Sequence, residues 1–265
     1  MAAAADGGII DSHVHLLQPS QFAYHWLKSE SPLNRDFSLA DFRAETQKSN
    51  VIGGILMEAT NTPQEIAWLL KVTEQDSRCW GVIGWIHLEQ PDAAAQIKHF
   101  AAHPNFKGVR LNWLVSRPNP DRLYAAMQAL QDRQLVVDVL VRFEYLPEVA
   151  ALIREFPRLT FVLDHMGGSP LSAATLGAWC STMRPFVSLP NVMLKVSGYS
   201  TETSLRGYLQ AAVTCFGVHR LMFGSNYPLC QRYTQTIEIL REASDTAWYA
   251  ALFRENALTT YKLRS

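Results

Sequence analysis

Near its N-terminus the chain reads Gly8-Ile9-Ile10-Asp11-Ser12-His13-Val14-His15, a short apolar run that ends in two histidines. Because residues i, i+2 and i+4 of a strand face the same side, we expect Asp11, His13 and His15 to project together from a first strand. Two imidazoles in one small space can bind a cation such as zinc, or polarise a group and transfer protons. A lone His-x-His is common, so its meaning depends on the fold that carries it.

Seven further apolar runs follow this one, separated by longer segments of helical period. We expect strands at 8–15, 51–58, 80–87, 107–111, 135–141, 160–164, 192–196 and 221–223. We expect helices at 63–74, 91–102, 120–132, 146–156, 207–216 and 233–243, and a closing helix at 247–261. Eight strand-helix units without a linker, in a chain of 265 residues, predict an α/β fold in which residues 1–265 form a single (β/α)8 TIM barrel with a C-terminal closing helix.

Polar or ionisable residues stand at the end of each expected strand. They are His13 and His15, Glu58, His87, Arg110, Arg142, Asp164 and His165, Lys195, and Ser225 with Asn226. In a (β/α)8 barrel the C-terminal ends of all strands converge on one mouth, where active sites of this fold lie. We therefore expect these residues to surround one site, although strands that leave the core also become polar there.

The overall charge gives the chain no field that would attract phosphate backbones or anionic lipid. Formal net charge is zero and the pI is about 7.1. No run approaches a membrane span and the N-terminal residues lack the pattern of a signal peptide. We expect a cytoplasmic protein with a small-molecule substrate and without nucleic-acid or membrane partners; homo-oligomerisation is left open.

Two later motifs carry further candidates. In Asp164-His165-Met166-Gly167-Gly168, His165 is expected to enter the mouth while the glycines allow close backbone approach; the alternative is a histidine held by Asp164 in a tight turn. Phe223 to Pro228 ends the last strand in small and polar residues, which a tight strand-to-helix turn also explains.

Two side chains outside these motifs have alternative readings. Trp26, in the loop after the first strand, is a candidate to stack on a substrate ring, and partial burial in the core is the alternative. Lys195 either binds a substrate anion or pairs with a neighbouring carboxylate.

Taken in order, the motifs resemble the amidohydrolase superfamily, and more closely its amidohydrolase-2 branch, which contains sugar-lactone and aromatic-pathway lactone hydrolases. The matching segments are 10–15, 108–110, 164–167, 195–198 and 220–228, and Asn256-Ala257 with Tyr261 is similar to the branch's closing helix. The resemblance implies a hydrolase in which activated water attacks a carbonyl carbon.

The resemblance also implies roles for individual residues. His13 and His15 would be metal ligands or carbonyl-polarising groups, and His165 a polarising group. Arg110 would clamp substrate oxygens, a role that suits a bidentate guanidinium. Asn226 stands at the remaining catalytic position. The other substrate-binding candidates are Arg142, Trp26 and Lys195.

Two positions depart from the family pattern. Asn226 replaces the aspartate expected in the last motif, and an amide can neither take a proton at neutral pH nor give a metal anionic charge. The fifth strand carries Asp138 and no histidine. The expected cofactor is therefore either none or a divalent metal such as zinc. The base would be Asp11, Glu58, Asp164 or a histidine.

Three functions follow from this set of residues. The first is a hydrolase that opens a small sugar or aromatic-pathway lactone, a cyclic ester, on a carbonyl polarised by histidine and arginine. The second is a metal-dependent hydrolase or decarboxylase of the same superfamily. The third is a degenerate protein that only binds its ligand, because the last strand carries Asn226 in place of a basic aspartate.

Overall fold

The computed structural model describes residues 7–114, 118–169, 171–199, 202–230 and 232–264. Its centre is an eight-stranded parallel sheet whose strands are hydrogen-bonded to one another in chain order. The strands are β1 (Ile9–Val14), β2 (Val51–Met57), β3 (Cys79–Gly84), β4 (Phe106–Asn112), β5 (Val136–Leu140), β6 (Thr160–Leu163), β7 (Val192–Val196) and β8 (Leu221–Phe223). A parallel bridge between Val14 and Tyr227 brings the first and last strands together, so the barrel is nearly closed.

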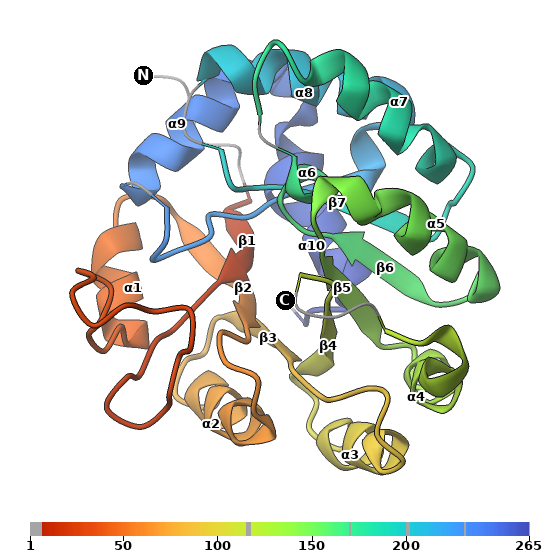
Figure 1. Cartoon of the computed structure of the whole chain (residues 1–265). Coiled ribbons are helices and arrows are strands. Elements are labelled where there is room, and N and C mark those ends of the chain that lie inside the picture. The colour runs from red at the N-terminus through yellow and green to blue at the C-terminus, as the bar shows by residue number, and fades with distance from the viewer. Residues whose placement is uncertain (1–6, 115–117, 170, 200–201, 231, 265) are drawn as a thin grey trace.

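Helices surround the barrel on its outside (Figure 1). They are α1 (Leu39–Thr46), α2 (Pro63–Thr73), α3 (Ala93–Phe100), α4 (Pro120–Asp132), α5 (Leu146–Glu155), α7 (Leu176–Val187), α8 (Glu202–Phe216) and α9 (Tyr233–Ala243). Two short elements, α6 (His165–Gly168) and α10 (Asn256–Thr260), lie at the ends of the barrel instead. Thr62 and Asn119 cap α2 and α4 with their side chains, and each is followed by a proline in the first helical turn. The predicted eight strands and the (β/α)8 fold are confirmed.

The closing segment is less regular than the continuous helix expected at 247–261. It consists of a 3-10 turn (Thr246–Trp248), a π-helical turn (Ala251–Glu255) and the short α10. Ala257 of α10 and Tyr261, just after it, pack against apolar side chains of the barrel interior. Those side chains are Ile10, Ile55, Met57, Ile83, Val136, Val162 and Met222. The segment thus closes one end of the barrel and leaves the other for the site.

Two layers of apolar packing hold the architecture together. The larger lies between the outer faces of the strands and the helices, and the smaller fills the barrel interior. Among the residues that the structure describes, no helix has the length and apolar character needed to cross a membrane.

Candidate active site

A register irregularity in β1 separates Asp11 from the two histidines that follow it. The pairing with β2 shifts between Asp11 and Val14. Oδ1 of Asp11 accepts hydrogen bonds from the backbone N–H groups of Ser225 (2.9 Å) and His13 (3.1 Å), which joins β1 to the turn after β8. Burial raises the pKa of Asp11 to about 6, although these hydrogen bonds oppose the shift. The expected alternation of Asp11, His13 and His15 on one face is therefore broken by the irregularity, and Asp11 contacts the β8 turn instead.

His13 and His15 belong to one chain of hydrogen bonds whose direction can be assigned. Nδ1 of His15 lies 3.2 Å from the carbonyl oxygen of Met57, which can only accept, so this nitrogen carries the proton. Nε2 of His15 then accepts from Nε2 of His13 at 3.1 Å. Nδ1 of His13 accepts in turn from the ammonium of Lys195 at 3.4 Å. The lone pairs of both imidazoles are thus already used.

Both rings are neutral in this arrangement. Burial, with Arg110 as the second cause, lowers the pKa of His15 to about 3. Burial and the charge of Lys195 hold the pKa of His13 well below its usual value, against the opposing charge of Asp164. A neutral pair is what the assigned hydrogen-bond direction requires.

Five buried charged side chains from different strands form a row that alternates in sign and runs from the barrel interior to the strand ends. In spatial order they are Asp138, Lys195, Asp164, Arg110 and Glu58. The ammonium of Lys195 pairs with Asp138 and lies 3.2 Å from Oδ1 of Asp164. Nε of Arg110 donates to Oδ2 of Asp164 at 2.9 Å, and Nη1 lies 3.5 Å from Oε1 of Glu58.

The two cations beside Asp164, the central carboxylate of the row, determine its ionisation. Burial raises the pKa of Asp164, but Lys195 and Arg110 outweigh it and hold the pKa well below its usual value. The far end of the row is fixed by Tyr261, whose hydroxyl lies 3.0 Å from each oxygen of Asp138. Asp164 therefore remains ionised between two cations.

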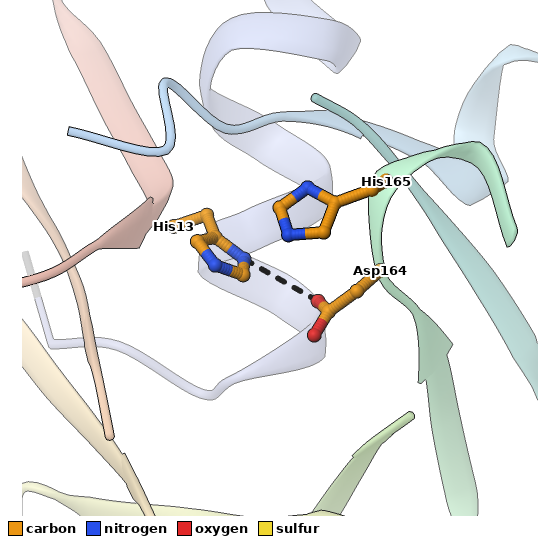
Figure 2. Close-up of side chains that lie close together, drawn as sticks. All are labelled: His13, Asp164 and His165. Atoms are coloured by element: carbon orange, nitrogen blue, oxygen red, sulfur yellow. Dashed lines mark ion pairs between the residues drawn. The ribbon is translucent and has the colours of Figure 1, made fainter. Parts of the chain in front are cut away.

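His165 begins a left-handed turn directly after β6. It has a φ of 50° and Met166 a φ of 54°, and the glycine that follows continues the turn at 72°. Nδ1 of His165 lies 2.8 Å from the hydroxyl of Ser197. Figure 2 shows the ring of His165 beside that of His13. The two ring centroids are 4.5 Å apart, and Nδ1 of His13 lies 3.3 Å from Oδ1 of Asp164, a contact that is an ion pair only when His13 is protonated. Burial lowers the pKa of His165 to about 4.

A pocket of about 370 Å³ opens at the C-terminal ends of the strands. It is lined by His15, His25, Trp26, Glu58, Ala59, Thr60, Asn61, Arg110, Asn112, Leu114, Leu140, His165, Asn226 and Leu229. Active-site pockets of (β/α)8 barrels lie at this end. The expected convergence of strand ends on one mouth is thus found for His15, Glu58, Arg110, His165 and Asn226, and the loop residue Trp26 joins them.

Two of these candidates are held by backbone contacts. Trp26 is 46% exposed, and its indole N–H donates to the carbonyl of Ala59 at 2.7 Å. Asn226 has a φ of 62° and its backbone N–H donates to the carbonyl of His13 at 2.9 Å. The partial core burial weighed for Trp26 does not describe it, because nearly half of the side chain faces solvent at the mouth.

The other candidates lie off the pocket. His13 lies behind His15 and His165, fully buried. Lys195 is likewise buried and pairs with carboxylates, the second of its two expected roles. Arg142 is 60% exposed and 4.0 Å from Glu144, and His87 is exposed, so neither lines the cavity.

The sequence-based selection missed the neutral part of the wall. These residues are Thr60, Asn61, Asn112, Leu114, Leu140 and Leu229, and His25 was noted only as a neighbour of Trp26. Ionisable residues at strand ends mark a site in the sequence, whereas neutral residues in the loops that follow carry no such signal. Asn112 and Leu140 are nevertheless the last residues of β4 and β5, so strand boundaries would have found them.

Three neighbouring side chains form a candidate donor set for a metal ion. His13, Asp164 and His165 offer ligand atoms that lie within 4.8 Å of one another, and two imidazoles with one carboxylate suit zinc chemically. However, Nδ1 of His13 and Oδ1 of Asp164 both face the ammonium of Lys195, at 3.4 and 3.2 Å, and the other oxygen of Asp164 accepts from Arg110. As arranged, the ammonium of Lys195 lies against two of the three donors, so a metal ion placed among them would meet its positive charge.

Comparison with known proteins agrees with this fold. Residues 10–263 match the family model described as amidohydrolase. An L-fucono-1,5-lactonase of Burkholderia ambifaria is 29% identical over 236 residues, which cover 83% of this chain and 80% of the relative. An L-fucono-1,5-lactonase of Burkholderia multivorans is also 29% identical, over 83% of this chain and 82% of the relative. A solved amidohydrolase of B. multivorans with bound zinc has a TM-score of 0.87 at 25% identity, covering 97% of this chain and all of that one.

Proposed function

Because this chain belongs to the amidohydrolase family, we propose that it is a hydrolase that opens a small, uncharged, hydroxylated lactone by addition of water to the ring carbonyl. Two relatives are L-fucono-1,5-lactonases, which supports a cyclic ester as the substrate. The observation that carries the proposal is the lining of the pocket. Beside His165 it holds the paired charges of Arg110 and Glu58 together with neutral side chains that form hydrogen bonds.

The charge balance of the wall favours a neutral sugar lactone over an aromatic-pathway lactone that carries carboxylates. Among the described lining residues, Arg110 is the one arginine or lysine, and its charge is offset by Asp164 and Glu58. A substrate dicarboxylate would need cations that are not already paired. The amides of Asn61, Asn112 and Asn226 and the hydroxyl of Thr60 suit ring hydroxyls instead.

The carbonyl chemistry is assigned to His165 and Arg110. In the tautomer whose Nδ1 accepts from the hydroxyl of Ser197, His165 presents an Nε2 proton to the pocket, and this neutral ring can polarise the lactone carbonyl. Arg110 supplies positive charge for the oxygen that becomes anionic when water adds. Trp26 offers an aromatic face at the mouth of the pocket, and Asn226 offers a hydrogen bond to the lactone ring.

His13 and His15 are positioning groups in this proposal. Their hydrogen bonds run from Lys195 to the Met57 carbonyl and fix the ring planes beside His165. Lys195 supplies the internal positive charge of the site, and the reaction uses no metal ion. Arg142 lies outside the pocket and has no assigned contact with the substrate.

A lactone panel with a pH indicator tests the proposal. We expect the purified protein to open uncharged 1,4- or 1,5-aldonolactones, to leave a pyrone dicarboxylate intact, and to keep its rate after dialysis against a chelator. His165→Ala should lower kcat/KM by about 10²–10³-fold, as loss of one oxyanion donor does. His99→Ala, an exposed histidine of α3, is the matched control and should not change it.

Three outcomes would contradict parts of the proposal. Turnover that disappears with the chelator and returns with zinc would show that the metal-free assignment is wrong. Opening of the dicarboxylate in preference to neutral lactones would reverse the substrate class. A wild-type protein without turnover that gains it as Asn226→Asp would be a binding protein that has lost its base.

A further inference from the structure

The proposed reaction needs a group that takes a proton from water, and most ionisable side chains near the pocket are already committed. The lone pairs of His13 and His15 accept hydrogen bonds within the chain described above. Asp11 accepts from the backbone N–H groups of Ser225, in the turn after β8, and of His13. Asn226 is an amide and has no useful basicity at neutral pH.

Two further carboxylates are excluded by their partners. Asp138 pairs with Lys195 and accepts from Tyr261, and Asp164 accepts from Arg110 and faces Lys195. Both side chains are fully buried and neither lines the pocket. A carboxylate in such a pair would have to leave its cation in order to act on water.

Glu58 differs from these groups in both position and partner. It directly follows β2, lines the pocket, and its side chain is only 4% exposed. Its carboxylate contacts Nη1 of Arg110 at 3.5 Å, which is long for a charge-assisted hydrogen bond. The contact orients the carboxylate toward the same guanidinium that is assigned to the carbonyl oxygen, and leaves lone pairs for a water molecule.

We propose that Glu58 is the general base that activates water for lactone opening. It would take over the function of the aspartate that the family pattern has at residue 226. This proposal rests on the proposed lactonase function. A carboxylate oxygen of Glu58 removes one proton from water while the water oxygen bonds to the carbonyl carbon. As the ring C–O bond breaks, Glu58 returns that proton to the leaving alkoxide. The sum is lactone plus water giving a hydroxy acid, with no other reactant.

The electrostatic surroundings of Glu58 are consistent with this role. The charged or titratable groups that face it are Arg110 from β4, Asp164 after β6 and Glu65 from α2. Burial is the largest influence and raises the pKa of Glu58, against the lowering effect of Arg110. A carboxylate of raised pKa is a stronger base than one in water and is still ionised more readily than a lone buried acid.

His165 is the competing candidate and suits the other role better. Its Nδ1 is engaged by Ser197, and burial lowers the pKa of the ring to about 4, which makes it a weak base. A neutral imidazole of this kind donates its proton to a carbonyl oxygen without becoming charged. The two side chains thus divide the work, with Glu58 on the water and His165 on the carbonyl.

The experiment compares Glu58→Gln, Glu58→Asp and wild type on a lactone that the wild type opens. Glu58→Gln should lower kcat by about 10²–10⁴-fold, the usual contribution of a general base, and change KM little. Wild type and Glu58→Asp should both lose activity on the acidic side of the pH profile, and that limb should be absent in Glu58→Gln. Glu144→Gln, an exposed glutamate outside the pocket, is the control and should match wild type.

The possible failures are distinguishable. A wild type that opens no lactone overturns the proposed function and this inference together. A wild type that opens lactones, with Glu58→Gln within threefold of it and the acidic limb unchanged, overturns the inference alone. If Glu58→Gln does not fold by near-ultraviolet circular dichroism, Glu58→Asp decides: a kcat lowered at least tenfold supports the base, and wild-type kcat overturns it.

Discussion

At the scale of single residues, Lys195 explains how a site of histidines and aspartates can stand without a metal ion. The ammonium of Lys195 faces His13 Nδ1 and Asp164 Oδ1, two of the atoms that could otherwise hold a metal. The sequence left two roles open for this lysine, and its burial against Asp138 and Asp164 selects the carboxylate pairing. A strand position alone could not reveal this, because the partners come from β5 and from the turn after β6.

The role of Lys195 leads to a stability prediction. Lys195→Met should lower the free energy of unfolding by about 3–5 kcal/mol, because it leaves Asp138 and Asp164 without their shared buried cation. The double variant Lys195→Met/Asp138→Asn should recover part of that loss. Urea unfolding of the three proteins measures it, with Lys98→Met, an exposed lysine of α3, as control. A loss below 1 kcal/mol would contradict the internal-cation role.

At the scale of elements, strands were easier to predict than helices and local irregularities. The runs at 192–196 and 221–223 coincide with β7 and β8, because buried parallel strands are continuous apolar runs. α1 was not expected, since its eight residues bury only Leu39, Phe42 and Thr46. α7 was not expected either, because it contains Pro185, and a proline interrupts a helical pattern. The β1 irregularity depends on the β8 turn that binds Asp11, so no local signal encodes it.

The junction of β1 and β8 gives a prediction at this scale. A Cβ at Gly224 would lie 2.7 Å from the Cβ of His13, so Gly224→Ala must push the two strands apart. We expect it to lower the free energy of unfolding by about 1–3 kcal/mol, as overpacking does, and to reduce kcat/KM by displacing the imidazoles.

Gly177→Ala is the matched control for that substitution. Gly177 lies within α7 and a Cβ there would meet no atom within 4 Å. Alanine should therefore raise stability slightly, by up to about 1 kcal/mol, through helix propensity. Thermal unfolding and lactone turnover of both variants check the pair. Equal effects of the two substitutions would mean that the β1–β8 contact does not control the site.

At the scale of the whole molecule, barrel closure is what assembles the site from distant segments. His15, Glu58, Arg110, His165 and Asn226 come from five strand ends and meet in one pocket because the strands are parallel and nearly closed. This convergence could be predicted from the periodic sequence. The neutral wall of Thr60, Asn61 and Leu114 could not, because loop conformation depends on tertiary contacts. One such contact is Glu65, which accepts from the backbone N–H groups of Ala59 and Thr60 at 2.9 and 3.1 Å.

Glu65 should make the stability of the whole fold depend on pH. Burial raises its pKa from 4.5 to about 8. The protonated side chain therefore stabilises the fold fully below pH 4.5, and this stabilisation is lost as the pH rises through 8. The pKa values of His15 and His165 lie at about 3 and 4, and these groups affect stability only below pH 6.5. Between pH 6.5 and 8 the free energy of unfolding should therefore fall by about 2 kcal/mol in wild type. Glu65→Gln keeps an oxygen for the two N–H groups and should flatten this slope, whereas Glu155→Gln, an exposed site, should retain it. Urea midpoints at the two pH values measure the difference, and an equal slope in Glu65→Gln and wild type would assign the dependence to another group.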